Sequence, residues 1–412
     1  MAQSYPNSYY RSARPVRPRR GAGRRLALIA LMGAAAFAGG FALLWTLGGW
    51  IVGGGGGGSG PDADAAAASA IMSTQTEYTV EPLVDLLAFR DLSYVPVKGI
   101  HLTPNAAGSA ETLEPRLGLA DRTELNAFVI DIKSDSGWVA YDTHVPMAQE
   151  LGVVDPIIED LDALIATLAE HDIIPIARIV CFKDNVMTKE RPDLAIQSSK
   201  GGVWAGKKDD LWLNPYNHEV WDYLVQIAED CARRGFREIQ FDYVRFPTDG
   251  DIASAEYPGK YCSKDDAIAG FLAYARPRLE KLGVWVSADV YGLVVTHQTN
   301  AFGQQLEKIC RSVDVVCPMV YPSHYDSGSF GVDDPNANPY KIVSGALQDA
   351  AERMVGTGAE CRPWLQDFEW SGVEYGPDLM EDQIRAAEEQ GFDEWLLWGP
   401  YRSSSEAALR SG

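Results

Sequence analysis

The stretch EIQFDYVRFP (residues 238–247) is the segment most informative about the fold, because it is short, rich in β-branched and aromatic residues, and carries Asp242 among apolar neighbours. Seven further runs of this kind occur along the chain, with longer stretches between them. Strands that alternate with helices form a parallel sheet, and eight such units close into a barrel. The expected strands cover residues 98–104, 127–133, 173–182, 238–247, 283–292, 313–322, 362–370 and 394–400.

Helical spacing of apolar residues marks four of the intervening stretches, residues 157–172, 218–235, 267–283 and 382–391. The second of these ends in arginines and Gly235, which is typical of the carboxyl end of a helix. A doubly wound open sheet is the alternative, but its Gly-rich phosphate loop after the first strand is missing here. The sequence therefore predicts an α/β chain whose residues 93–412 form a (β/α)8 TIM barrel.

The amino-terminal part is expected to attach the barrel to a membrane. Residues 26–52 are apolar and uncharged, and about 20 such residues cross a bilayer. The basic segment 1–25 should remain cytoplasmic, and residues 53–92 form a Gly/Ala-rich flexible linker and lead-in. A cleaved signal peptide is the alternative, although its apolar region is shorter. We expect a single-pass protein of the cell membrane, with residues 26–52 in the lipid bilayer and the barrel extracellular.

Charge and cysteine content exclude some classes of partner and site. The formal net charge is −21, and since residues 1–25 carry seven arginines and no acid, the rest of the chain carries −28. Such an acidic body argues against nucleic acid as a partner. The six cysteines form no C-x-x-C pair, and Cys181 and Cys317 lie in apolar runs, so we expect mostly free, buried thiols, with disulfides as the alternative. No cofactor and no metal site is expected, because no two histidines stand at ligand spacing.

Two acids on neighbouring strands are the main catalytic candidates. In a barrel of this kind the active residues lie at the carboxyl ends of the strands. Alternation along residues 238–247 places Gln240, Asp242 and Val244 on the inward face. The same argument turns Ser287 and Asp289 inward in the next strand. Glycosidases use such a pair of carboxylates, whereas the structural alternative is an ion pair or a hydrogen-bonded acid.

Polar residues near the other strand ends are candidates for substrate binding. They could equally form salt bridges at the rim, and several of the tryptophans could belong to the core. Trp398, late in the eighth strand, is the best candidate to stack on a sugar ring. The whole set is Asp131, Lys133, Arg178, Lys183, Asn214, Gln240, Arg245, Tyr321, His324, Gln366 and Trp398.

Five segments, EIQFDYVRFP, PIARIVCFKD, LWLNPY, CPMVYPSHY and RPWLQDF, are similar to a family of bacterial barrel proteins known as the "putative glycosyl hydrolase domain". The resemblance runs from about Gly99 to Tyr401. It implies a TIM barrel with carbohydrate-active chemistry.

A looser likeness connects the chain with the α-amylase superfamily. That group places an Asp nucleophile on strand four, an acid on strand five and a stabilising Asp on strand seven, which by strand count implies Asp242, Asp289 and Asp367. Two departures stand out, since the amylase acid is a Glu and the Arg two residues before the nucleophile is Gln240 here.

These observations together lead us to expect a glycoside hydrolase that cleaves a polysaccharide. Asp242 would be the nucleophile or base, Asp289 the general acid, and Asp367 a residue that orients the sugar. The alternative is a non-catalytic barrel that binds cell-wall polysaccharide. A polysaccharide deacetylase would need a His/Asp metal site, and the six histidines are scattered.

Overall fold

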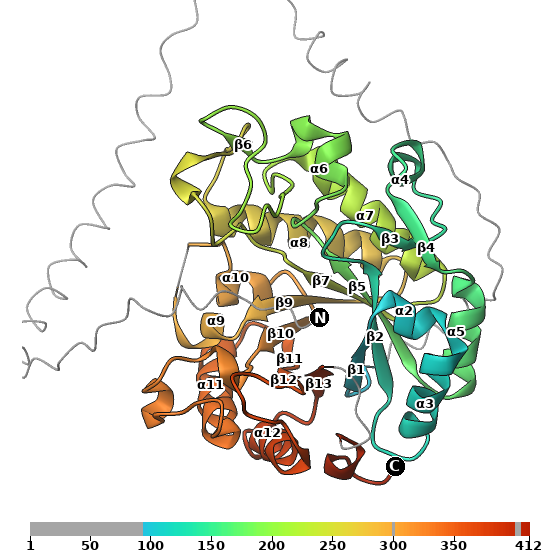
Figure 1. Cartoon of the computed structure of the whole chain (residues 1–412), viewed down its shortest axis with the longest axis vertical. Helices are drawn as coiled ribbons and strands as arrows, with labels where there is room; N and C mark the ends of the chain where they lie inside the picture. The colour runs from blue at the N-terminus through green and yellow to red at the C-terminus, as the bar shows by residue number, and fades with distance from the viewer. Residues whose placement is uncertain (1–93, 299–300, 400–404) are drawn as a thin grey trace, which may run out of the picture. The chain divides into compact units, whose positions relative to one another are not determined.

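The computed structural model describes residues 94–298, 301–399 and 405–412. Eight parallel strands form a closed barrel in these ranges, because β1 pairs with β13 on one side and with β2 on the other (Figure 1). All eight predicted strands and the barrel are thus confirmed. The barrel strands are β1 (Lys98–Leu102), β2 (Ala127–Lys133), β5 (Ile174–Val180), β7 (Glu238–Asp242), β9 (Trp285–Tyr291), β10 (Val315–Met319), β12 (Trp364–Gln366) and β13 (Trp395–Trp398).

Helices surround the strands on the outside of the barrel (Figure 1). The four predicted helices correspond to α5, α7, α8 and α12, with shifts of a few residues at their ends. Gly235 follows α7 with a φ of 106°, a left-handed conformation that few other residues adopt. The helices are α2 (Pro104–Gly108), α3 (Ala110–Ala120), α4 (Pro146–Glu150), α5 (Leu161–Glu170), α6 (Met187–Glu190), α7 (His218–Arg233), α8 (Lys264–Glu280), α9 (Leu293–Thr296), α10 (Leu306–Cys310), α11 (Pro339–Met354) and α12 (Pro377–Glu389).

The loops between the barrel strands and the helices contain short strands and 3-10 helices. The strand β6 in the loop after β5 pairs with β8 in the loop after β7, which ties these two loops together. The remaining strands are β3 (Val139–Tyr141), β4 (Val154–Ile158), β6 (Gln197–Ser198), β8 (Ala255–Glu256) and β11 (Glu360–Cys361). The 3-10 helices are η2 (Pro192–Leu194), η3 (Ile252–Ser254), η4 (Pro322–His324), η5 (Ser329–Gly331) and η6 (Ser405–Ala408).

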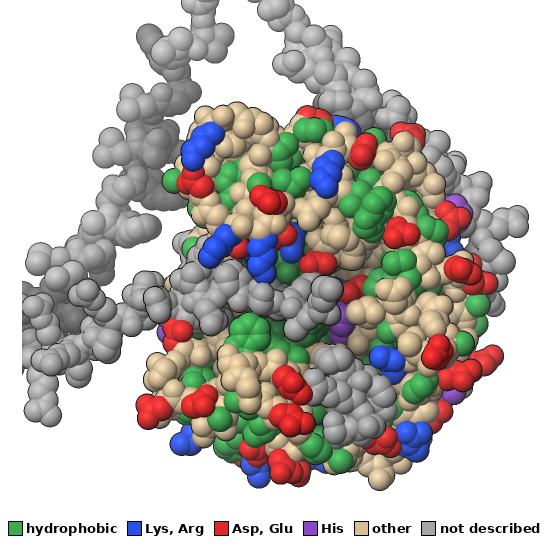
Figure 2. Space-filling model, viewed as in Figure 1, with side chains coloured by type: hydrophobic (Ala, Val, Ile, Leu, Met, Phe, Trp, Pro, Cys, Tyr) green, Lys and Arg blue, Asp and Glu red, His purple; other side chains and the backbone are tan. Residues whose placement is uncertain are grey.

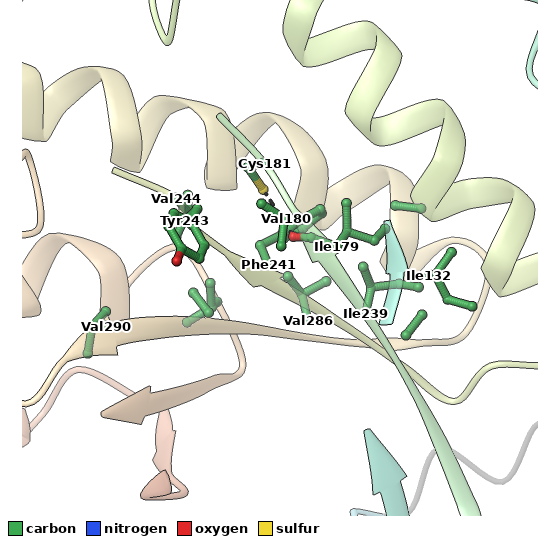
Figure 3. Packing of buried hydrophobic residues seen from close by; sticks show 14 of the residues in the cluster. Ile132, Ile179, Val180, Cys181, Ile239, Phe241, Tyr243, Val244, Val286 and Val290 are labelled. Carbon is green, nitrogen blue, oxygen red and sulfur yellow. Dashed lines mark hydrogen bonds between the residues drawn. The ribbon is translucent and has the colours of Figure 1, made fainter. Parts of the chain in front are cut away.

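The core has two layers that follow the alternation of side chains along the strands. Ile239 and Phe241 of β7 belong to the large apolar cluster between strands and helices (Figure 3). A smaller cluster, which includes Val129, Ile176 and Leu396, fills the barrel interior. The residues between those of the outer layer therefore point into the barrel, as the alternation predicts for Gln240.

Two expectations concern the whole chain. Among the described residues, no helix is long and apolar enough to cross a bilayer. The tail 1–25, the anchor 26–52 and the linker 53–92 lie outside those residues, so their roles stay predictions. All six cysteines are free, and five of them are buried, which confirms the expected thiols.

Candidate active site

Arg178 joins acids from two neighbouring strands inside the barrel. It lies on β5, and its Nη1 donates to Asp131 Oδ1 of β2 at 2.5 Å. Its Nε donates to Asp242 Oδ2 of β7 at 3.1 Å, and Nη2 donates to the same oxygen. The inward position predicted for Asp242 brings it to this arginine, so Asp242 is part of a buried ion pair.

Asp289 on β9 is the second acid of the cluster, and its side chain is 1% exposed. The indole Nε1 of Trp364 donates to its Oδ1 at 2.7 Å. Its Oδ2 lies 3.9 Å from the same Arg178 Nε that bonds Asp242. Because one atom is close to both acids, the two Oδ2 oxygens are at most about 7 Å apart, so the carboxyl groups of Asp242 and Asp289 are close neighbours.

The acids of this cluster differ in their electrostatic surroundings. Burial raises the pKa of Asp289 well above its ordinary value, and the negative charge of Asp242 adds to the effect. Arg178 and the Trp364 indole offset only part of it. Burial also raises the pKa of Asp131, but the charges and hydrogen bonds of Arg178 and His101 lower it by more, so that this pKa is about 2. One carboxyl therefore favours its protonated form while a neighbour stays ionised.

His101 belongs to this cluster, although the sequence did not single it out. Its Nε2 lies 3.0 Å from Asp131 Oδ2, and its ring stacks on Trp398 with 4.0 Å between ring centres. Arg178 lies over the same indole, with Cζ 4.9 Å from the ring centre. Trp398 thus packs against two residues of the acid cluster. The available signal was a polar residue within the apolar run 98–104.

Three of the predicted binding residues have enclosed positions that favour a structural role. Lys133 is fully buried, with Nζ 2.8 Å from Asp184 Oδ2 and 2.9 Å from the Val180 carbonyl. Asn214 donates to the Pro258 carbonyl at 2.8 Å. Gln240 points inward, as predicted, and donates to Cys317 Sγ at 3.3 Å. The expectation that these side chains bind substrate gains no support from their contacts.

Two loops meet around Gln366, the last residue of β12. Its Oε1 accepts from the Ser323 backbone at 3.1 Å and its Nε2 donates to the Phe368 carbonyl at 2.9 Å. Nearby, the rings of Tyr321 and His324 lie 5.4 Å apart. Burial lowers the pKa of His324 to about 4, so this ring is neutral at pH 7. These residues organise the loops after β10 and β12.

Asp367, the third predicted catalytic acid, lies just beyond the end of β12. It follows Gln366 by one residue and has the opposite parity. It lines a small hollow with Leu119 and Leu397 of the apolar outer layer and with His101 of the acid cluster. The catalytic role of Asp367 stays a prediction.

Two basic residues lie beside the Tyr243 ring, just beyond Asp242. Lys183 Nζ is 5.4 Å from the ring centre and within ion-pair distance of Asp135 and Asp210. Arg245 Cζ is 4.8 Å from the same ring centre. Tyr243 has a φ of 49°, which ends the strand alternation at Asp242. The inward position predicted for Val244 is therefore wrong, since Val244 packs in the outer layer.

The surface has hollows of two kinds. A hollow of about 540 Å³ lies at the amino-terminal ends of β5, β7 and β9, lined by residues such as Pro175, Phe236 and Val284. This is the end of the barrel opposite to the acids. Figure 2 shows another recess near the centre of the face drawn there, with histidine and acidic side chains at its edge.

The fold and the cluster define an eight-stranded barrel with a buried pair of acids on neighbouring strands. Residues 99–403 match the family described as "Putative glycosyl hydrolase domain", and the chain belongs to that family. The predicted family is thus confirmed, and membership supports a glycoside hydrolase. None of the curated proteins matches the chain.

Several solved structures are similar to this chain. A hypothetical protein from Ruminiclostridium thermocellum is 41% identical over 46% of this chain and 97% of its own, with a TM-score of 0.44. Flavobacterium johnsoniae chitobiase is 11% identical over 73% of this chain and 44% of its own, with a TM-score of 0.47. An alpha-galactosidase from Thermus thermophilus is 14% identical over 74% of this chain and 62% of its own, with a TM-score of 0.48.

Proposed function

We propose that the barrel is a glycoside hydrolase that cleaves a polysaccharide outside the cytoplasm, held at the membrane by residues 26–52. The observation that carries this proposal is the pair of acids on β7 and β9, Asp242 and Asp289, in unlike environments. Asp242 accepts hydrogen bonds from the Arg178 guanidinium. Asp289 is buried and has a raised pKa. Glycoside hydrolysis needs one carboxylate and one carboxylic acid.

The chemistry follows from this difference. Asp289 donates its proton to the oxygen of the glycosidic bond as that bond breaks, so that the leaving sugar departs as an alcohol. Asp242 either attacks the anomeric carbon or takes a proton from the attacking water. Arg178 and the backbone N–H of Tyr243, which donates to Asp242 Oδ1 at 2.5 Å, hold the carboxylate in place. Water supplies the hydroxyl of the new reducing end.

A non-catalytic polysaccharide-binding barrel is the second candidate. Two nitrogens of Arg178 bond one oxygen of Asp242, an arrangement also found in purely structural ion pairs. The low exposure of Asp289 favours the same interpretation. Binding would then depend on aromatic residues such as Trp398, and neither acid would be needed for activity.

Release of reducing ends separates the two candidates. The full chain, purified in detergent, would be incubated with a panel of cell-wall and dietary polysaccharides, beside Asp242→Asn and Asp289→Asn. Asp155→Asn, a change at an exposed acid of β4, is the matched control. We expect a loss of about 10³-fold or more in both site variants and none in the control. Binding by every variant without release by the wild type would favour the second candidate.

A further inference from the structure

Arg245 occupies a cage of three aromatic rings. Its Cζ lies 4.8 Å from the ring centre of Trp212, 4.8 Å from that of Tyr243 and 4.7 Å from that of Tyr291. The residue is 6% exposed. Ring faces attract a cation and fix its position without using its N–H donors. The cage therefore holds the guanidinium without using its N–H donors.

The charge of Arg245 is not matched by an acid. Its Nη1 donates to the Phe246 carbonyl at 3.1 Å, and the described part of the chain places no carboxylate within ion-pair distance of it. The buried Arg178 and Arg362 differ, since each bonds two acids. A guanidinium carries five N–H donors, and a buried charge without a counter-ion is costly. Arg245 thus has both the charge and the donors to bind an anion.

The cage lies beside the acid cluster. Tyr243 directly follows Asp242 and donates its backbone N–H to that carboxylate. Tyr291 ends β9, two residues after Asp289 and on the same face of the strand. The left-handed φ of Tyr243 is strained for a bulky side chain, and such strain is concentrated at functional sites. Lys183, on the other hand, is already neutralised by Asp135 and Asp210.

We propose that Arg245 binds a carboxylate on the sugar chain next to the cleaved bond, so that the substrate is an acidic glycan. This inference rests on the proposed glycoside hydrolase function. A guanidinium bonds a carboxylate through two parallel hydrogen bonds, which gives both orientation and charge selectivity. The carboxylate could belong to the ring of a hexuronate or to a lactyl ether such as that of muramic acid. Because the rest of the chain is strongly acidic, a local cation is needed to bind either kind of carboxylate.

The test compares each acidic glycan with a neutral counterpart. The full chain in detergent would be assayed on polygalacturonate, polymannuronate and a glucuronan, each beside its carboxyl-reduced form. Peptidoglycan glycan strands with free or amidated lactyl groups form the other arm. We expect kcat/KM on one acidic glycan to exceed that on its neutral counterpart at least about tenfold. Whether that glycan is a uronate polymer or a peptidoglycan strand identifies the source of the carboxylate. Equal rates on the two members of the cleaved pair overturn the proposal.

Substitutions at Arg245 test whether this residue causes the preference for acidic glycans. We expect Arg245→Gln to lower the ratio of kcat/KM on the acidic member to that on the neutral member about 10- to 100-fold, and Arg245→Lys to retain part of the preference. Arg385→Gln, at an exposed arginine of α12, is the control. Circular dichroism checks that Arg245→Gln folds. If it does not fold, the substrate preferences of the wild type and of Arg245→Lys test the role of Arg245. A preference that survives in Arg245→Lys undiminished overturns the assignment.

Calorimetric binding of the same oligosaccharides keeps this inference separate from the proposed function. If nothing is hydrolysed, the hydrolase proposal fails. Binding of an acidic oligosaccharide that is lost in Arg245→Gln would still support the anion site. The anion-site proposal is overturned if acidic and neutral oligosaccharides bind equally well and Arg245→Gln changes neither affinity.

Discussion

The indole N–H of Trp364 donates to Asp289 at 2.7 Å, which joins β12 to the acid of β9 across the barrel interior. Trp364 is 1% exposed, so its ring is a core element and not a platform for sugars at the rim. A neutral donor that bonds a carboxylate favours the ionised form. Trp364 therefore limits how far burial raises the pKa of Asp289.

Replacing Trp364 by Phe should shift the pH profile of hydrolysis. Loss of the N–H donor raises the pKa of Asp289 further, so the acid keeps its proton to higher pH. The alkaline limb of kcat/KM against pH, which reports the general acid, should move upward. Trp395→Phe removes another buried indole, at the start of β13, and serves as the control. A downward shift, or an equal shift in both variants, would contradict this assignment.

Asp131 should make folding stability depend on acid. Its folded pKa of about 2 lies below the ordinary 3.8, so its contribution is fully present above pH 4 and is lost as pH falls toward 2. The difference corresponds to about 2 kcal/mol of unfolding free energy. Urea unfolding of the wild type and Asp131→Asn between pH 5 and 2 measures it. The two proteins should converge in stability as the pH falls, and parallel curves would refute the role of Asp131.

Local patterns predicted the barrel and the inward acids, because alternation along a strand is a property of a few adjacent residues. The partners of those acids follow from the register between strands. Arg178 meets Asp131 and Asp242 only because β5 lies between β2 and β7, and 47 and 64 residues separate these pairs in sequence. The buried ion pair of Lys133 with Asp184 was not predicted, and here the β2–β5 register shifts between Asp131 and Lys133. Such an irregularity changes the direction in which a side chain points, and the local sequence does not reveal it.

Lys133 should matter for stability and not for substrate affinity. Lys133→Met leaves Asp184 buried without its cation, and breaking a buried pair in this way costs about 3–5 kcal/mol. The double variant Lys133→Met, Asp184→Asn removes both charges and should recover part of the loss. Urea unfolding measures the free energies, and KM at a temperature where the variants are folded tests binding. A large rise in KM with unchanged stability would restore Lys133 to the binding site.

Cys262 should be the first thiol to react in the folded protein. It is half-buried, whereas the other five cysteines are buried. Burial and the nearby Asp266 and Asp265 raise the pKa of its thiol, so the thiolate is scarce near pH 7 and the reaction is slow. Mass spectrometry after N-ethylmaleimide should find a single adduct at Cys262 in the native protein, none in Cys262→Ser, and six adducts after denaturation. Fewer than six after denaturation without reductant would mean that a disulfide has formed and that the free-thiol arrangement of the barrel is not kept in solution.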